Sequence, residues 1–179
     1  MFYVSEIKTA PPSRFQTPLQ ELVYQTLKTL DIPFERVDTE EAVSMEDCVS
    51  IEARLEMKMV KTLFLCNRQQ TAFYLFITEG GKPFRSKDFS QAMGVSRVSF
   101  APAEKMAAML GTKIGAATVF SALLDRENQV QIVLDKAVAE EPWYGCSDGT
   151  TTGYMKLSTA DIRNKFLPFT GHAPAVIEV

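Results

Sequence analysis

The pattern of apolar and polar positions predicts a first helix after residue 17. Its apolar stripe consists of Leu19, Leu22, Val23, Leu27 and Leu30. Thr17 can cap this helix, Pro18 suits its first position, and Gln20 completes a capping box. A second helix is predicted to begin after Ser44, which can also act as a cap, because acidic residues occupy the turn that follows.

Strand-like runs of apolar and β-branched residues follow at 60–66 and 71–78, and a polar turn joins them into a predicted antiparallel hairpin. The runs 118–124 and 129–134 predict a second hairpin of the same kind. Further strands are predicted at 33–38, 97–100 and 150–157, and further helices at 86–93, 103–110 and 160–166. Helices and strands intermix without regular alternation, which favours an α+β fold with a largely antiparallel or mixed sheet.

The length and composition are those of one globular domain. The chain has 179 residues, of which 46% are hydrophobic and 23% charged. It has no apolar run of the length that a membrane span needs, and its first residues do not resemble a signal peptide, so we expect a cytoplasmic protein with no membrane contact. The net charge of −3 argues against binding along DNA, but it allows binding of an RNA end or a small charged ligand.

The cysteine and histidine residues do not suggest a metal centre or a catalytic triad. Cys48, Cys66 and Cys146 are far apart in the sequence, so neither a disulfide framework nor a zinc site is expected. His172, the single histidine, is expected at the surface. The chain also lacks the glycine motifs of nucleotide cofactor sites, and we expect no cofactor.

Lys61 is an unusual residue for its surroundings, because it lies at the start of an apolar strand-like run. A buried ammonium group is costly unless a polar or anionic group meets it. Two interpretations remain open: the lysine stem packs while its ammonium reaches solvent, or the ammonium binds a ligand.

Two loops offer further polar groups. The loop 110–118 contains Gly111 and Gly115, and its main-chain amides could hold a carbonyl or phosphate oxygen. The loop 145–153 is rich in glycine and hydroxyl side chains and could line a polar pocket. Each could equally be an ordinary connection, and Cys146 is expected to be a small buried apolar residue.

Several of these segments together resemble the YbaK/ProX superfamily of aminoacyl-tRNA editing domains, which also occur as insertions in bacterial prolyl-tRNA synthetases. The similar stretches are 61–68, 82–84, 94–102 and 144–146, and they most resemble the clostridial-type prolyl-tRNA editing proteins. The resemblance extends over about residues 18–166. It implies a single compact α+β domain with a mixed, partly barrel-like β-sheet flanked by helices.

The resemblance also implies an activity: hydrolysis, in trans, of the ester that joins a wrong amino acid to the 3′ end of a tRNA. The expected substrate is alanyl-tRNA for proline, or that tRNA carrying another small amino acid. A synthetase separates small apolar side chains by only about 1–3 kcal/mol, so such a second sieve is useful. The implied partners are the acceptor end of mischarged tRNA and a prolyl-tRNA synthetase. The family is thought to use a bound water rather than a protein nucleophile.

The resemblance assigns roles to individual residues. Lys61 matches a lysine of the family and is expected to contact the ester or the terminal phosphate. Gly115 matches the first residue of the family's glycine loop and is expected to hold the substrate through its backbone. The expected substrate-binding residues are Thr62, Ala116, Ala117, Thr118, Val119, Ser147 and Thr151.

Four of these positions depart from the family pattern. Thr62 replaces the usual asparagine, and Val119 replaces a proline. Ser147 stands where the family has a histidine after Gly-Cys, and Thr151 stands where it has an asparagine. The alternative function is therefore a non-catalytic protein that binds an amino acid or aminoacyl-tRNA in a regulatory role. The predicted organisation is an N-terminal arm at 1–16, the editing domain at 17–170 and a C-terminal tail at 171–179.

Overall fold

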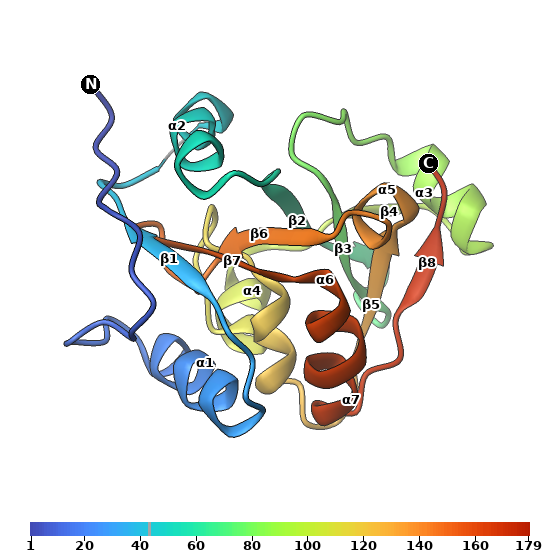
Figure 1. Ribbon diagram of the computed structural model, residues 1–179. Coiled ribbons are helices and arrows are strands. Elements are labelled where there is room, and N and C mark those ends of the chain that lie inside the picture. The colour runs from blue at the N-terminus through green and yellow to red at the C-terminus, as the bar shows by residue number, and fades with distance from the viewer. Residues whose placement is uncertain (43) are drawn as a thin grey trace.

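Two β-sheets and the helices around them make up the fold in the computed structural model, which describes residues 1–42 and 44–179 (Figure 1). The larger sheet has the strand order β4 (Val98–Phe100), β2 (Val60–Asn67), β3 (Phe73–Glu79), β5 (Val130–Asp135) and β8 (Ala175–Ile177). The smaller sheet has the order β1 (Glu35–Asp38), β7 (Gly153–Ser158) and β6 (Trp143–Ser147).

The helices occupy the segments between these strands and the end of the chain. They are α1 (Pro18–Thr29), α2 (Met45–Leu55), α3 (Ser86–Met93), α4 (Ala103–Leu110), the 3₁₀ helix η1 (Val119–Leu123), α5 (Lys136–Ala139), α6 (Thr159–Asp161), the π-helical turn η2 (Ile162–Phe166) and α7 (Leu167–Phe169). Within the described parts of the chain, every helix is too short or too polar to cross a bilayer.

The pairing of the strands is mixed, as predicted. Strands β2 and β3 form the expected antiparallel hairpin, whereas β5 runs parallel to both β3 and β8. A parallel bridge between Met59 and Gly145 links the start of β2 to β6 of the smaller sheet. This bridge joins the two sheets, and the predicted α+β domain with a partly barrel-like sheet is confirmed.

The two capped helices form where the sequence places them. The Thr17 hydroxyl accepts a hydrogen bond from the Gln20 N–H at 3.0 Å, and Ser44 and Asp47 form a reciprocal capping box. The Gln20 side-chain oxygen, however, accepts from the Gln16 N–H at 2.7 Å rather than closing the predicted box at Thr17. The Gln20 side chain thus binds the N–H of Gln16, one residue before the N–H of Thr17 that a capping box would use.

The predicted second hairpin is wrong. Residues 119–123 form the 3₁₀ helix η1, which Thr118 caps, and β5 pairs with β3 instead. Val119, Phe120 and Ala122 are all buried in this helix. A short run that is apolar at nearly every position does not separate a buried strand from a buried helix, which accounts for the error.

The end of the chain also differs from expectation. Residues 150–152 belong to a turn, so the last predicted strand begins at Gly153, and strands β6 and β8 were not predicted. His172, which was expected at the surface, is 4% exposed. Its Nε2 lies 2.8 Å from an Asp125 carboxylate oxygen, and its Nδ1 lies 2.9 Å from the Thr170 hydroxyl. Because both ring nitrogens have partners, the imidazole can be buried at little cost.

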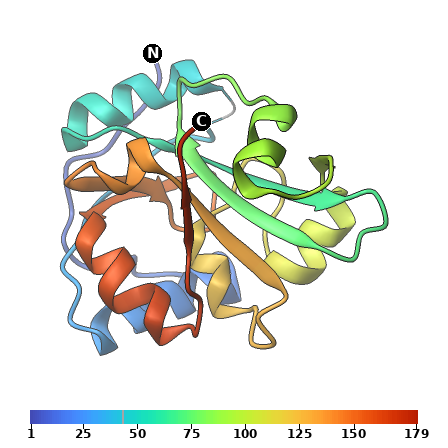
Figure 2. The same cartoon turned by 90° about the vertical axis from the view of Figure 1, so that its right-hand side faces the viewer.

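Alternate residues of the larger sheet face two separate cores. One face packs against α1, η1 and the helices at 159–169, and the other packs around Phe89 of α3 (Figure 2). Successive side chains of a strand point to opposite faces. Lys61 lies directly opposite Thr78 in the β2–β3 register, so both belong to the face that carries α3.

Candidate functional site

A cavity of about 570 Å³ lies where the start of β2 approaches α2, α4 and the loops 114–117 and 147–151. Its lining includes six of the residues singled out from the sequence, namely Lys61, Thr62, Gly115, Ala117, Ser147 and Thr151. The other three, Ala116, Thr118 and Val119, are buried and do not line it. Segments far apart in the sequence thus meet at one cavity.

The cavity lies along an open edge of β2. Strand β4 pairs with β2 at residues 65–67, and the Met59–Gly145 bridge lies just before β2, so among the described residues only the stretch between them has no strand pairing on that side. The Phe64 carbonyl accepts from the Ala101 N–H at 2.9 Å on the β4 side. Because main-chain groups alternate between the two sides of a strand, the N–H and C=O of Thr62 also point to this edge. Within the described residues neither group has a hydrogen-bond partner, so both can meet an extended ligand.

Lys61 is half-buried, and its ammonium donates a hydrogen bond to the main-chain carbonyl of Lys82. Burial lowers the pKa of the Lys61 ammonium below its ordinary value of 10.5. Among the described residues, no carboxylate forms an ion pair with it. An ammonium group has three N–H donors, so two remain for a ligand.

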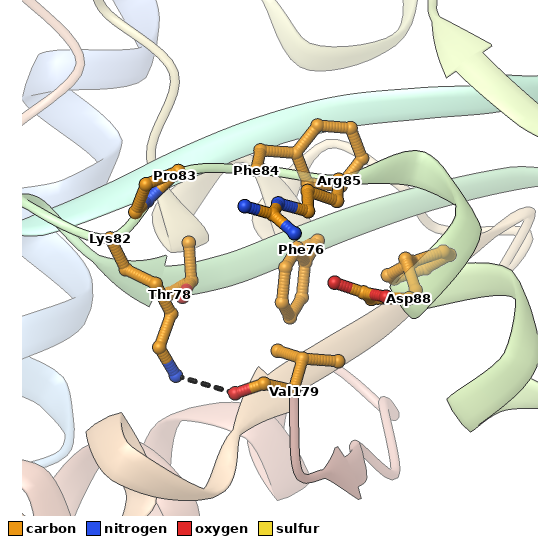
Figure 3. Close-up of a pocket in the computed structure, with 9 residues that line it drawn as sticks. Phe76, Thr78, Lys82, Pro83, Phe84, Arg85, Asp88 and Val179 are labelled. Atoms are coloured by element: carbon orange, nitrogen blue, oxygen red, sulfur yellow. Dashed lines mark hydrogen bonds between the residues drawn. The ribbon is translucent and has the colours of Figure 1, made fainter.

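The segment that carries this acceptor is itself anchored, at a second cavity of about 220 Å³ (Figure 3). The Lys82 ammonium lies 2.7 Å from Oδ2 of the buried Asp135 and donates to the Val179 carbonyl at 2.9 Å. The Thr78 hydroxyl donates to the same carboxylate oxygen at 2.6 Å. Burial raises the pKa of Asp135, but hydrogen bonds from Lys82, Thr78 and the Ala137 N–H outweigh it, and the net pKa is lowered.

Two residues of the glycine loop, Gly115 and Ala117, line the main cavity. Gly115 has a φ of +92°, which glycine adopts without the strain that other residues incur. The Ala116 N–H donates to the Lys113 carbonyl at 3.0 Å. Within the described residues, the N–H groups of Gly115 and Ala117 have no hydrogen-bond partner. The loop therefore places two unused donors beside the cavity.

Asp148 orders the opposite loop, although the sequence did not single it out. Its fully buried carboxylate accepts hydrogen bonds from the Gln20 amide at 2.9 Å, the Tyr24 hydroxyl at 2.8 Å and the Thr150 hydroxyl at 2.7 Å. The Ser147 hydroxyl donates to the Thr150 carbonyl at 2.6 Å, so it is used within the loop. The sequence Ser-Asp-Gly at 147–149 indicates a turn, but it does not show that the Asp148 carboxylate binds residues of α1.

The rest of the lining was not predicted. Thr151 donates from its hydroxyl to the Glu41 carboxylate at 3.3 Å, and Glu41 also pairs with Lys113 at 3.3 Å. Soft apolar side chains complete this wall, namely Met45, Cys48, Met59 and Met106. Burial raises the pKa of the Cys48 thiol and raises that of the Cys146 thiol far more. Neither sulfur is poised to act as a nucleophile.

Residues 39–165, which include this cavity's principal polar groups, match the aminoacyl-tRNA editing domain family. The chain belongs to this family. The protein is accordingly an aminoacyl-tRNA hydrolase, whose substrate is aminoacylated tRNA. A curated relative is the prolyl-tRNA editing protein ProX of Acetoanaerobium sticklandii, which is 22% identical over 160 residues. That match covers 89% of this chain and 97% of the relative.

Two crystal structures share the fold of this editing domain. A hypothetical protein gives a TM-score of 0.67 at 15% identity, with 87% of this chain and 97% of the other covered. A candidate trans-editing enzyme for prolyl tRNA synthetase gives a TM-score of 0.62 at 17% identity, with 92% and 99% covered. These similarities extend over nearly the whole of each chain.

Proposed function

We propose that this hydrolase acts in trans, in the cytoplasm, on tRNA for proline that carries alanine or another small amino acid. The observation that carries the proposal is the meeting of Lys61, the Gly115 loop and the loop 147–151 at one cavity. A volume of about 570 Å³ is in the range of small-molecule sites, which supports a ligand of the size of an aminoacylated terminal nucleoside. The name of the A. sticklandii relative supports proline tRNA as the substrate, and the description of the trans-editing neighbour supports a prolyl-tRNA synthetase as a partner.

The donors around the cavity suit ester hydrolysis. A water adds to the ester carbonyl carbon, and the carbonyl oxygen becomes an oxyanion. The bond to the ribose oxygen then breaks, and that oxygen takes up the proton that the water has given up. In the proposed arrangement the free N–H groups of Gly115 and Ala117 hold the oxyanion. Lys61 stabilises the same charge or the neighbouring phosphate with its two remaining donors. Fixed donors of this kind account for a large part of catalysis in acyl transfer.

The acceptors on the other wall suit the amino acid. The Glu41 carboxylate lines the cavity, and the Thr62 carbonyl points to the open edge of β2. Both are suited to the α-ammonium group of the substrate, which carries a positive charge at neutral pH. In this arrangement the amino acid lies between an anionic wall and a cationic one, with its ester toward Lys61.

Hydrolysis of preformed alanyl-, seryl- and cysteinyl-tRNA for proline tests the proposal. We expect the wild type to release at least one of these amino acids, and Lys61→Ala to lower the rate by roughly 100-fold. Lys58→Ala is the matched control, because Lys58 is exposed, pairs with Glu141 and does not line the cavity. Release that is equal in Lys61→Ala and in the wild type would exclude the role of Lys61. No release from any of the three tRNAs would exclude the proposed substrate.

A further inference from the structure

The segment around α3 is basic, although the chain as a whole is acidic. Between residues 82 and 97 there are four cationic side chains, and the only acidic one is Asp88. Lys82 is bound to Asp135. Arg85, Lys87 and Arg97 are exposed, and none of them forms an ion pair within the described residues. Their charge is therefore available to a partner.

Two of these cations line a groove of about 440 Å³ on α3 and the segment before β4. Its lining consists of Ser86, Lys87, Ser90, Gln91, Val95 and Arg97. Two cations and three side chains that can form hydrogen bonds surround the groove, and its lining has no carboxylate. Arginine and lysine in such a setting are the usual ligands of phosphate groups.

The groove is connected to the cavity by β4, beside which α3 packs (Figure 2). Arg97 precedes this strand, and Phe100, three residues later, lines the cavity. That separation is about 10 Å along a strand, which one or two nucleotides can span. The Phe100 side chain is 61% exposed, and its ring centroid lies 5.5 Å from that of Phe84. An exposed aromatic ring beside a basic surface is typical of single-stranded RNA sites.

We propose that the groove around Lys87 and Arg97 binds the sugar-phosphate backbone of the tRNA acceptor arm while the 3′ end enters the cavity. This inference rests on the proposed function, because it needs a charged tRNA as the substrate. It explains how a protein with a net charge of −3 holds RNA: the positive charge is local and adjoins the site. The exposed ring of Phe100, next to the half-buried ring of Phe84, marks the path between groove and ester.

The double variant Lys87→Gln/Arg97→Gln tests the groove, with Lys28→Gln/Arg126→Gln as its control. The control removes the same charge from two exposed residues, on α1 and in the turn after η1, away from α3 (Figure 1). The readouts are KM and kcat for aminoacyl-tRNA and the affinity for an RNA hairpin with the acceptor stem and a free 3′ end, measured by fluorescence anisotropy across salt concentrations.

We expect the groove variant to weaken hairpin binding and raise KM about tenfold, and to reduce the slope of log affinity against log salt by roughly 2, while kcat is unchanged. The control should behave as the wild type. Equal losses in both variants, or no loss in either, would overturn the inference. Because hairpin binding needs no hydrolysis, it separates the two proposals: a wild type that binds through the groove but releases no amino acid contradicts the proposed function alone.

Discussion

At Lys61, the partner of the ammonium is a main-chain carbonyl, which keeps its polarity at every pH. The charge of the lysine is therefore governed by burial, which lowers its pKa. If the ammonium stabilises the reaction, activity depends on its being protonated. Deprotonation removes the positive charge and one donor at the same time.

The alkaline side of the pH–rate profile is expected to reflect this group. As pH rises through the lowered pKa of Lys61, kcat/KM should fall, at a pH below the ordinary lysine value of 10.5. In Lys61→Gln this fall should be absent and the residual rate should be low throughout. The measurement is kcat/KM between pH 6 and the alkaline limit of ester stability, corrected for spontaneous hydrolysis. A fall of the same shape in Lys61→Gln would assign the titration to another group.

At the scale of elements, the anchor formed by β3, β5 and the turn after β3 ties the Lys82 segment to the sheet. The Asp135 carboxylate receives bonds from Thr78 and from Lys82 at its end of β5. Since the pKa of Asp135 is lowered in the folded state, its ionisation stabilises the fold above the unfolded pKa of about 3.9. That contribution is lost as the pH falls through the folded pKa.

Replacement of Asp135 by asparagine should therefore destabilise the protein by roughly 2 to 3 kcal/mol at pH 7, because a buried ion pair and a charged hydrogen bond are broken. The difference from the wild type should shrink as the pH falls below the unfolded pKa of about 3.9 toward the lowered pKa of the folded state, where the wild-type carboxylate also becomes protonated. Urea unfolding at both pH values measures it. Asp88→Asn, at an exposed site, should change stability little. A difference that persists unchanged at low pH would contradict the linkage.

Local signals predicted the elements that local forces decide. Thr17 and Ser44 cap their helices through neighbours within three residues, so the sequence shows them directly. The 3₁₀ helix η1 was missed because burial on all sides removes the polar alternation that identifies an element, and this placed Thr118 and Val119 in the core rather than at the cavity. The conformation of the Gly115 loop depends on the glycine itself, which the sequence shows, and its position at the cavity was expected.

Partners that are distant in the chain account for most of the remaining errors. His172 is buried because its ring Nε2 can donate a hydrogen bond to the carboxylate of Asp125, 47 residues earlier. Asp148 is held by Gln20 and Tyr24, which lie 128 and 124 residues away. Nothing near His172 or Asp148 in the sequence shows these contacts. They arise only when α1 and the final helices pack on the sheets.

Across the whole molecule, the two sheets meet at the bridge between Met59 and Gly145, next to the cavity. A Cβ atom on Gly145 would lie 2.1 Å from the Met57 sulfur and 2.9 Å from the Lys58 carbonyl oxygen. The methionine can move, but the carbonyl belongs to the backbone that leads into β2. The absence of a side chain at residue 145 thus sets how closely the sheets approach.

Gly145→Ala should force the sheets apart at this bridge. We expect a loss of about 1–3 kcal/mol in unfolding free energy, together with a lower kcat/KM, because Lys61 and the loop 147–151 would shift relative to each other. Gly81→Ala, where an added Cβ meets nothing within 4 Å, should change neither quantity appreciably. Chemical denaturation and deacylation kinetics on both variants measure the effect. If Gly145→Ala were destabilised but fully active, the bridge would not be needed to position the site residues.

The hydrogen bond between Lys61 and the Lys82 main chain has a consequence for how this site drifts over evolutionary time. Every amino acid supplies the same carbonyl, so no point mutation at residue 82 can delete the acceptor. The Lys82–Asp135 ion pair, by contrast, is lost with a single codon change. Substitutions at residue 82 should therefore make the segment less rigid but leave the hydrogen bond of Lys61 in place. Selection on this contact then acts only on the lysine at residue 61.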